Sequence, residues 1–164
     1  MDFQNINNIF FIGVAGTGMS AFAQYCAGIG KTVSGSDRYF VANTFNDTQE
    51  KLEKFKVKCF PQDASGIAEN TELIIISTAV EDSNIEIQKA KDLNIPIIKR
   101  SELLSLISDT KKTIAVGGTS GKSTTTAMIF DILDAGGLQP SIISGAGLVR
   151  LQERHFIGNA FVPP

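Results

Sequence analysis

Short apolar runs alternate along this chain with longer segments whose apolar residues recur at helical spacing. The runs lack the apolar–polar alternation of a half-exposed strand, and such runs are typical of strands covered on both faces. They predict strands in the first two thirds of the chain at Ile9–Ile12, Lys31–Ser36, Val57–Phe60, Glu72–Ser77 and Ile95–Ile98.

The intervening segments predict helices, with Ser101 as the expected N-cap of the last. These run from the glycines after Ile12 to about Gly30, then over Thr44–Lys54, Asn84–Leu93 and Ser101–Ile107. Leu52 and Phe55 are expected to face inward. Regular alternation of strand and helix predicts an α/β fold: a Rossmann-like, doubly wound parallel sheet with helices on both faces.

The first strand runs into a glycine-rich loop, in which Gly13, Gly16 and Gly18 precede a helix. In a Rossmann-type unit this turn places a pyrophosphate on the helix N-terminus. Ala15 stands where the usual fingerprint has its middle glycine. Asp37 follows the second strand, where an acidic residue usually binds a ribose hydroxyl. The loop therefore predicts a nucleotide or dinucleotide site; tight helix–strand packing, with Asp37 as a simple cap, is the alternative.

A second glycine-rich loop, Gly117–Thr124, lies between an expected strand at Thr113–Val116 and an expected helix from about Lys122 to Asp134. It has the features of a P-loop, although Val116 stands where the Walker pattern has its first glycine. In such loops backbone amides surround phosphates, the lysine reaches the β- and γ-phosphates, and the following hydroxyl binds Mg²⁺. Lys122 and Ser123 take these roles here. The alternative is a glycine-capped strand-to-helix turn.

The polar segment Ser108–Lys112 predicts a domain boundary between residues 1–108 and 109–164. Beyond it we expect about two strands, including Ile142 and Ile143, and one helix ended by Gly136 and Gly137. No further strand–helix pair is expected after Ile143. This is too little for a complete P-loop domain, so we expect the chain to be a fragment of a longer protein.

The composition is that of a soluble globular protein, with 43% hydrophobic and 20% charged residues and a formal net charge of −2. That balance predicts neither a nucleic-acid surface nor a basic membrane face. The amino terminus lacks the basic region of a signal peptide, and no apolar run is long enough to span a membrane. Cys26 and Cys59 are expected to be reduced thiols, which favours a cytoplasmic location over a disulfide.

Taken together, these motifs resemble the Mur ligases, ATP-dependent amide ligases that build the peptidoglycan stem peptide. Residues 118–124 are similar to the family's G-T-x-G-K-[ST]-T loop, which also lacks the first Walker glycine. The segments 11–20, 33–37, 75–84 and 95–102 look like the UDP-binding region of its L-alanine-adding branch. In two positions the chain departs from that branch: Ser120 replaces a histidine and Ser123 a threonine.

The resemblance implies an enzyme that uses ATP and Mg²⁺ to join L-alanine to UDP-N-acetylmuramate in peptidoglycan synthesis. It implies Lys122 as the catalytic charge clamp, Ser123 as the metal ligand, and ATP contacts from Gly118, Thr119, Ser120, Gly121, Lys122, Ser123 and Thr124. The UDP-sugar would be bound by Ala15, Gly16, Thr17, Gly18, Met19, Ser20, Ser36, Asp37, Ser77 and Thr78. The chain alone is expected to be inactive.

Several alternatives stay open at this point. A murein-peptide recycling ligase acting on the same nucleotide sugar shares the amino-terminal pattern, and a non-catalytic UDP-sugar-binding module fits the chain as it stands. His155, the only histidine, is read as a surface or packing residue, and Lys111 and Lys112 as a solvated linker. Arg100 follows a strand end, where either a phosphate or a surface ion pair fits.

Overall fold

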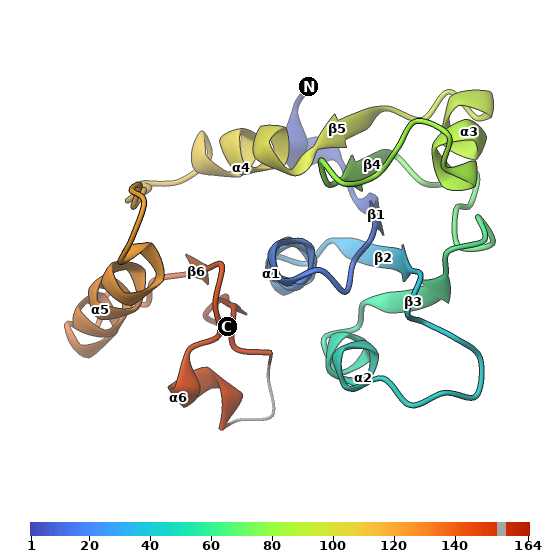
Figure 1. Cartoon of the computed structure of the whole chain (residues 1–164). Coiled ribbons are helices and arrows are strands. Elements are labelled where there is room, and N and C mark those ends of the chain that lie inside the picture. Colours follow the sequence, from blue (N-terminus) through green and yellow to red (C-terminus); the bar gives the residue numbers. More distant parts are fainter. Residues whose placement is uncertain (154–156) are drawn as a thin grey trace.

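The computed structural model describes residues 1–153 and 157–164 (Figure 1). Its main feature is a five-stranded sheet in which all neighbouring strands are parallel, in the order β3-β2-β1-β4-β5. The strands are β1 (Asn8–Ile12), β2 (Thr32–Asp37), β3 (Lys58–Pro61), β4 (Leu73–Ile76) and β5 (Ile97–Lys99). The Rossmann-like α/β prediction is confirmed, with strand ends within two residues of those expected.

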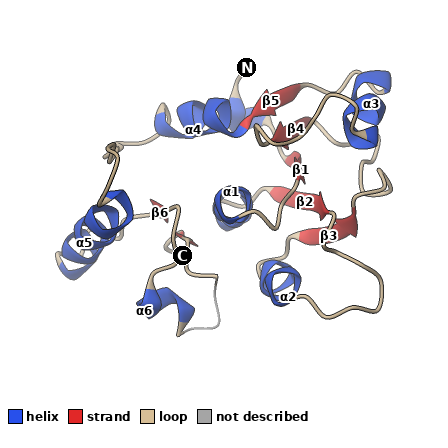
Figure 2. Cartoon of the chain, in the orientation of Figure 1, coloured by secondary structure: helices blue, strands red, loops and turns tan. Residues whose placement is uncertain are grey.

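Helices cover both faces of this sheet, as predicted (Figure 2). On one face, Ile9 and Phe11 pack with residues of α1, α2 and α4; on the other, Phe10 and Ile12 pack with α3. Adjacent residues of β1 are thus buried on opposite faces, which explains the unbroken apolar run. The helices are α1 (Thr17–Gly28), α2 (Asp47–Lys54), α3 (Ile85–Asp92) and α4 (Arg100–Ser108), after a short 3₁₀ helix at Phe3–Asn5.

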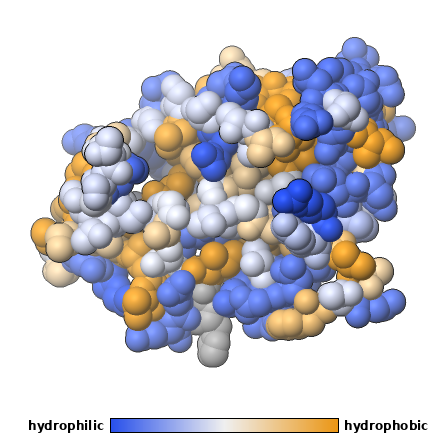
Figure 3. All heavy atoms as spheres, in the orientation of Figure 1, coloured by the Kyte–Doolittle hydropathy of each residue, from blue (hydrophilic) through white to orange (hydrophobic). Residues whose placement is uncertain are grey.

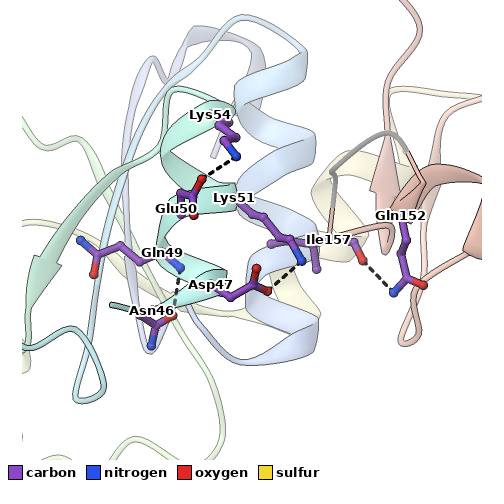
Figure 4. Close-up of polar contacts among 8 residues, drawn as sticks. All are labelled: Asn46, Asp47, Gln49, Glu50, Lys51, Lys54, Gln152 and Ile157. Carbon is purple, nitrogen blue, oxygen red and sulfur yellow. Dashed lines mark hydrogen bonds and ion pairs between the residues drawn. The ribbon is translucent and has the colours of Figure 1, made fainter. Parts of the chain in front are cut away.

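Helix α2 begins three residues later than the sequence pattern indicates. Its N-cap is Asn46, whose side-chain oxygen accepts a hydrogen bond from the Gln49 amide at 3.0 Å (Figure 4). Asparagine is among the best N-cap residues, so this cap fixes the start. The pairs Lys51–Asp47 and Lys54–Glu50, at 2.7 and 2.6 Å, follow on its exposed side. Leu52 is fully buried, as predicted, and Phe55 is half-buried.

Ser101 is not the N-cap of α4, so that prediction was wrong. The cap is Lys99, at the end of β5, and the carboxylate of Glu102 accepts a hydrogen bond from the Lys99 amide at 3.1 Å. Glu102 thereby takes the position three residues after the cap where an acidic side chain satisfies a free backbone donor. The helix therefore leaves the sheet directly, with no intervening loop.

Residues after the polar linker form a smaller unit, whose elements are α5 (Lys122–Ala135), β6 (Ile142–Ile143), α6 (Val149–Gln152) and β7 (Ala160–Phe161). Strands β6 and β7 pair antiparallel. The sequence analysis expected no further strand–helix pair after Ile143, and it missed the short helix α6 and the short strand β7. Its core contains Phe130, Ile142, Leu148 and Leu151. The Phe130 and Phe161 rings meet edge to face, with centroids 5.9 Å apart.

The strand predicted at Thr113–Val116 is also absent. These residues are irregular, and Ile114 is 63% exposed. A strand needs a neighbour for its backbone hydrogen bonds, and no strand in the described ranges pairs with this segment. Helix α5 likewise has an uncovered apolar side that includes Met128 and Ile132, where apolar atoms reach the surface at the left of Figure 3.

The smaller unit packs on the sheet unit through helix α1, beside which β6 and the carboxyl-terminal end lie in Figure 1. Val162 contacts the α1 backbone at Gly28, where a methyl group in place of the glycine hydrogen would meet the valine at 2.9 Å. Both cysteines are free, and burial raises the pKa of the Cys26 and Cys59 thiols to about 12. Across the described residues, no helix has the length and apolar character needed to cross a bilayer.

Candidate functional site

The first glycine loop joins β1 to α1 and is held by the neighbouring strand. The amides of Gly13 and Val14 donate to the Ser36 carbonyl oxygen at 2.8 and 2.9 Å. Gly13 has φ +79°, a left-handed conformation that glycine adopts without steric cost. Gly16 is the N-cap of α1, and its own amide donates back to Gly13 at 3.2 Å. The conformation of the loop is therefore fixed by hydrogen bonds to β2.

Asp37 uses one carboxylate oxygen to bind this loop and the other to bind the segment after β2. Oδ2 accepts a hydrogen bond from the Ala15 amide at 2.9 Å, and Oδ1 accepts one from the Tyr39 amide at 3.1 Å. The side chain is only 6% exposed. Asp37 thus connects the first glycine loop to the segment after β2, a role that the sequence did not indicate. The ribose contact expected from its position stays a prediction.

The first turn of α1 offers free backbone donors. In the described part of the chain, the amides of Thr17, Gly18 and Met19 donate no hydrogen bond. These amides and the helix dipole make a partial positive charge that favours an anion. The side chains of Met19 and Ser20 are buried, so what they present to a ligand is backbone.

Arg100 adds a full positive charge at the same place, because its guanidinium lies against Gly18 where a side chain would otherwise project. Within residues 1–153 and 157–164 it forms no ion pair. The surface ion pair considered for Arg100 is thus not formed. A guanidinium beside the positive end of a helix attracts an anion, so the arrangement suits a phosphate group.

Ser77 and Thr78 reach the same edge of the sheet from β4. Ile12 of β1 pairs with Ile76 of β4, so both strands end at the same level. The chain leaves β1 toward β2 on one side, while β4 lies on the other. This is the topological switch point at which open α/β sheets bind their ligands. Ser77 Oγ accepts from the Ala79 amide at 3.3 Å, and Thr78 is exposed.

A cavity of about 240 Å³ extends this edge, a feature that the sequence analysis missed. It lies where β2 and β3 end, just beyond Asp37, and is lined mainly by apolar side chains. The lining includes Phe40, Val41, Thr44, Cys59, Phe60 and Pro61. The aromatic residues after Asp37 were the available sequence signal. A planar base fits such a position, because it is partly apolar and lies next to the proposed ribose site.

Glu86, the first carboxylate of α3, is a second residue that the sequence analysis missed. It is fully buried and accepts a hydrogen bond from the Ser36 hydroxyl at 2.6 Å. The Ser36 carbonyl also accepts hydrogen bonds from the Gly13 and Val14 amides, so Glu86 stabilises the glycine loop indirectly, through Ser36. Burial raises the pKa of the Glu86 carboxyl, the nearby Asp63 carboxylate raises it further, and the hydrogen bond from Ser36 opposes both.

Glu86→Gln is expected to stabilise the protein increasingly as pH rises above about 4.5. The folded state binds the Glu86 proton more tightly than the unfolded state, so wild-type stability falls as pH rises through the folded-state pKa. Glutamine has no proton to lose, and the variant lacks this dependence. Urea unfolding of both proteins between pH 4 and 8 measures the difference. Glu69→Gln, at an exposed glutamate, is the matched control, and parallel pH curves for Glu86→Gln and wild type would contradict the prediction.

The second glycine loop leads directly into α5 on the smaller unit. Gly118 has φ +143°, and Gly121, the N-cap of α5, has φ +76°. Lys122 begins α5, as predicted, and its ammonium donates to the Gly118 carbonyl at 2.7 Å. The lysine thus points back into its own loop. Ser123 lies half-buried in the first turn of α5, beside an exposed Thr124.

These residues fit a nucleotide phosphate and its magnesium ion. In the described residues, the amides of Lys122, Ser123 and Thr124 donate no hydrogen bond, and the Ser123 hydroxyl has no hydrogen-bond partner. An amide-rich, positively charged turn with a free hydroxyl is the donor set that phosphate and Mg²⁺ use in P-loops. No cluster of three His, Cys, Asp or Glu side chains suited to a metal ion occurs among the described residues.

The structure gathers the predicted residues into two groups. Residues from Ala15 to Ser20, Asp37, Ser77 and Thr78 meet at one edge of the sheet, whereas Ser36 is buried beneath it. The residues of the second glycine loop lie just before α5 and in its first turn, and α5 packs on β6, α6 and β7. Lys111 and Lys112 are exposed, and His155 lies outside the described residues.

The chain is similar in sequence and in structure to known ligases. The family model described as "Mur ligase family, catalytic domain" matches residues 8–112. A UDP-N-acetylmuramate–L-alanine ligase from Caulobacter vibrioides is 40% identical over 84% of this chain and 28% of its own length. The crystal structure of a UDP-N-acetylmuramate-alanine ligase from Thermotoga maritima superposes with a TM-score of 0.79 and is 31% identical, covering 94% of this chain and 34% of that one.

A UDP-N-acetylmuramate:L-alanyl-gamma-D-glutamyl-meso-diaminopimelate ligase from Neisseria meningitides is also similar in structure. Its TM-score is 0.79 at 25% identity, over 97% of this chain and 47% of that one. The chain thus spans about a third of the length of the L-alanine ligases that it matches. Since the family model matches well over half of its residues, in the sheet unit that carries the first glycine loop, the chain belongs to the Mur ligase family.

Proposed function

We propose that this chain is the nucleotide-binding portion of an ATP-dependent, amide-forming ligase that joins L-alanine to UDP-N-acetylmuramate. The observation that supports the proposal is the presence on one chain of two glycine-rich loops, each leading into a helix with free amides and a nearby cation. The first is the α1 loop with Arg100, and the second is the α5 loop with Lys122. Residues 1–108 would form the UDP-sugar domain, and residues 109–164 part of the ATP-binding domain.

In the sheet unit, the pyrophosphate would lie on the free amides of Thr17, Gly18 and Met19, beside Arg100. The ribose would lie near Asp37, and the uracil in the cavity where β2 and β3 end. Ser77 and Thr78 would face the sugar from β4. The apolar cavity, Asp37, and the free amides with Arg100 follow one another along the same edge, as the base, ribose and pyrophosphate of a nucleotide do.

In the smaller unit, Gly118 to Thr124 would hold ATP, with Lys122 neutralising phosphate charge and Ser123 binding Mg²⁺. ATP supplies the phosphoryl group that activates a carboxylate for amide formation. Such catalysis depends on positioning and charge neutralisation. The chain by itself would be inactive, because the segment before the loop is irregular and α5 is partly uncovered. The location would be cytoplasmic, where reduced thiols such as Cys26 and Cys59 persist.

A murein-peptide ligase is the second candidate. The likeness to the Neisseria ligase covers nearly the whole chain, and both activities begin from a UDP-linked muramate. The two would differ in the amino acid or peptide that they add. Assay of the complete enzyme for phosphate release, with UDP-N-acetylmuramate, ATP, Mg²⁺ and either L-alanine or the tripeptide, distinguishes them: release with L-alanine is expected.

Binding by the isolated chain tests the nucleotide assignment. Calorimetry with UDP-N-acetylmuramate, UDP and NAD should give heat with the two uridine ligands and weaker or no binding of NAD. The physical reason is the compact cavity beyond Asp37, which suits one base next to its ribose. A preference for NAD would instead indicate a dinucleotide-binding oxidoreductase. If the isolated chain binds UDP-N-acetylmuramate but the complete enzyme shows no turnover, the protein is a non-catalytic UDP-sugar-binding module.

A further inference from the structure

Asn159, immediately before β7, is joined to the first turn of α1 by a buried hydrogen-bond network. Its side-chain amide donates to the Thr17 carbonyl oxygen at 2.7 Å and to Ser20 Oγ at 3.0 Å. Its side-chain oxygen accepts from Gln24 Nε2 at 2.7 Å. Asn159 is fully buried, and Gln24 and Ser20 are nearly so. Both donated bonds therefore end on the first turn of α1, which directly follows the glycine loop of the proposed nucleotide-sugar site.

The backbone around Asn159 is held on the other side by the smaller unit. The Asn159 carbonyl accepts from the Ser144 amide at 2.8 Å, and the Gly158 carbonyl accepts from the Leu148 amide at 2.8 Å. Gln152 of α6 donates to the Ile157 carbonyl at 3.3 Å (Figure 4). Asn159 thus projects from a fixed turn. That turn belongs to the group of elements on which α5, the helix of the P-loop, packs.

The bond from Asn159 to Thr17 acts on the peptide group that faces the ligand. The carbonyl of Thr17 and the amide of Gly18 belong to one peptide unit, and the Gly18 amide is a free donor beside Arg100. A hydrogen bond accepted by the carbonyl polarises the peptide and strengthens its N–H as a donor. Together with the bond that Ser20 Oγ donates to the same carbonyl at 3.0 Å, it fixes the direction in which that N–H points. Full burial keeps water from replacing the bond.

We propose that Asn159 is a positioning residue for the nucleotide-sugar loop. It orients the Thr17–Gly18 peptide toward the pyrophosphate, and it makes this orientation depend on the unit that carries the P-loop. This rests on the proposed function, in that the ligand is a UDP-sugar. The competing explanation is that the Asn159 network only holds the two units together and does not orient the loop. It predicts equal effects from every residue of the network.

Three variants of the 164-residue chain separate these explanations. Asn159→Asp keeps the shape and the acceptor for Gln24 but loses both donated bonds to the loop. Asn159→Ala removes all three bonds. Gln24→Ala is the matched control, because it removes the bonds that Gln24 Nε2 donates to Asn159 and to the Ser20 carbonyl but leaves those from Asn159 to the Thr17 carbonyl and Ser20 Oγ in place. Circular dichroism first identifies a temperature at which each variant is folded.

Two measurements are made on every variant. Calorimetry with UDP-N-acetylmuramate should show an about tenfold or greater loss of affinity for Asn159→Asp and Asn159→Ala. The loss for Gln24→Ala should be less than about threefold. The affinity for ADP should be unchanged in all three variants. Hydrogen exchange of the Ser20 amide, which donates to the Gly16 carbonyl at 2.8 Å, should be faster in the Asn159 variants than in the control, with no ligand present.

Equal changes in all three variants, or unchanged exchange and affinity in folded Asn159→Asp, would overturn the proposal. Absence of UDP-sugar binding by the wild-type chain would count against the proposed function alone. The exchange rates would still decide whether Asn159 orders the loop. A loss of ADP affinity equal to the loss of UDP-sugar affinity would also overturn it, because that result indicates general loosening of both units.

Discussion

Lys122→Ala in the complete ligase is expected to lower turnover by at least about 10²–10³-fold, the range seen when one transition-state stabilising group is removed. The ammonium of Lys122 lies inside its own loop, 2.7 Å from the Gly118 carbonyl oxygen, where a transferring phosphoryl group would meet it. Removing it leaves the developing phosphate charge without its cation. Phosphate release with UDP-N-acetylmuramate, L-alanine, ATP and Mg²⁺ measures the effect.

Binding of UDP-N-acetylmuramate to the same variant should be nearly unchanged, because the first glycine loop lies on the sheet unit and makes no hydrogen bond with the P-loop within residues 1–153 and 157–164. Lys112→Ala, at an exposed lysine in the linker, is the matched control and should retain full activity. Retained turnover in Lys122→Ala would remove this lysine from the mechanism. An equal loss of turnover in Lys122→Ala and Lys112→Ala would indicate that the net positive charge matters and not the position of Lys122.

Asp37→Ala is expected to weaken binding of UDP-N-acetylmuramate to the 164-residue chain by about 1–3 kcal/mol, the cost of leaving a buried donor unpaired. Two backbone amides, those of Ala15 and Tyr39, lose their acceptor at once. The glycine loop then loses its connection to the segment that lines the cavity. Asp37→Asn keeps one acceptor oxygen, so its affinity for UDP-N-acetylmuramate should lie between those of wild type and Asp37→Ala. Calorimetry on folded protein gives the affinities.

Asp47→Ala is the control for charge. Its carboxylate pairs with Lys51 at 2.7 Å on α2 but is 62% exposed, and such surface pairs contribute about 0–1 kcal/mol. Affinity for the nucleotide sugar should not change. If Asp37→Ala binds as tightly as wild type, the loop keeps its shape without the carboxylate, and the assignment of this edge of the sheet loses its main support.

The sequence was sufficient to predict the sheet unit because its strands are short apolar runs buried on both faces. Phe10 and Phe11 are both fully buried, on opposite sides of β1, and such a pattern leaves little choice but a covered parallel strand. Helix starts were less certain. Asn46 and Lys99 are N-caps that local pattern did not identify, since the choice among neighbouring residues depends on where the preceding strand or loop ends.

Thr113–Val116 shows the opposite case, in which a strong local pattern was wrong. The residues are β-prone and apolar, but a strand forms only against a partner, and none in the described structure is available. The P-loop that follows still forms its turn and helix. Its geometry depends on Gly118, Gly121 and the helix N-terminus, which are local in sequence.

By itself, the sequence determined both glycine loops, the positions of Asp37 and Lys122, and the α/β alternation, because each follows from residues close together in the chain. Only the tertiary structure decided what those residues contact. It joined Asp37 to the Ala15 amide, Glu86 to Ser36, and Asn159 to Thr17, each across a long stretch of sequence. Buried polar groups require partners, and which partner lies within reach is set by how strands and helices pack rather than by local pattern.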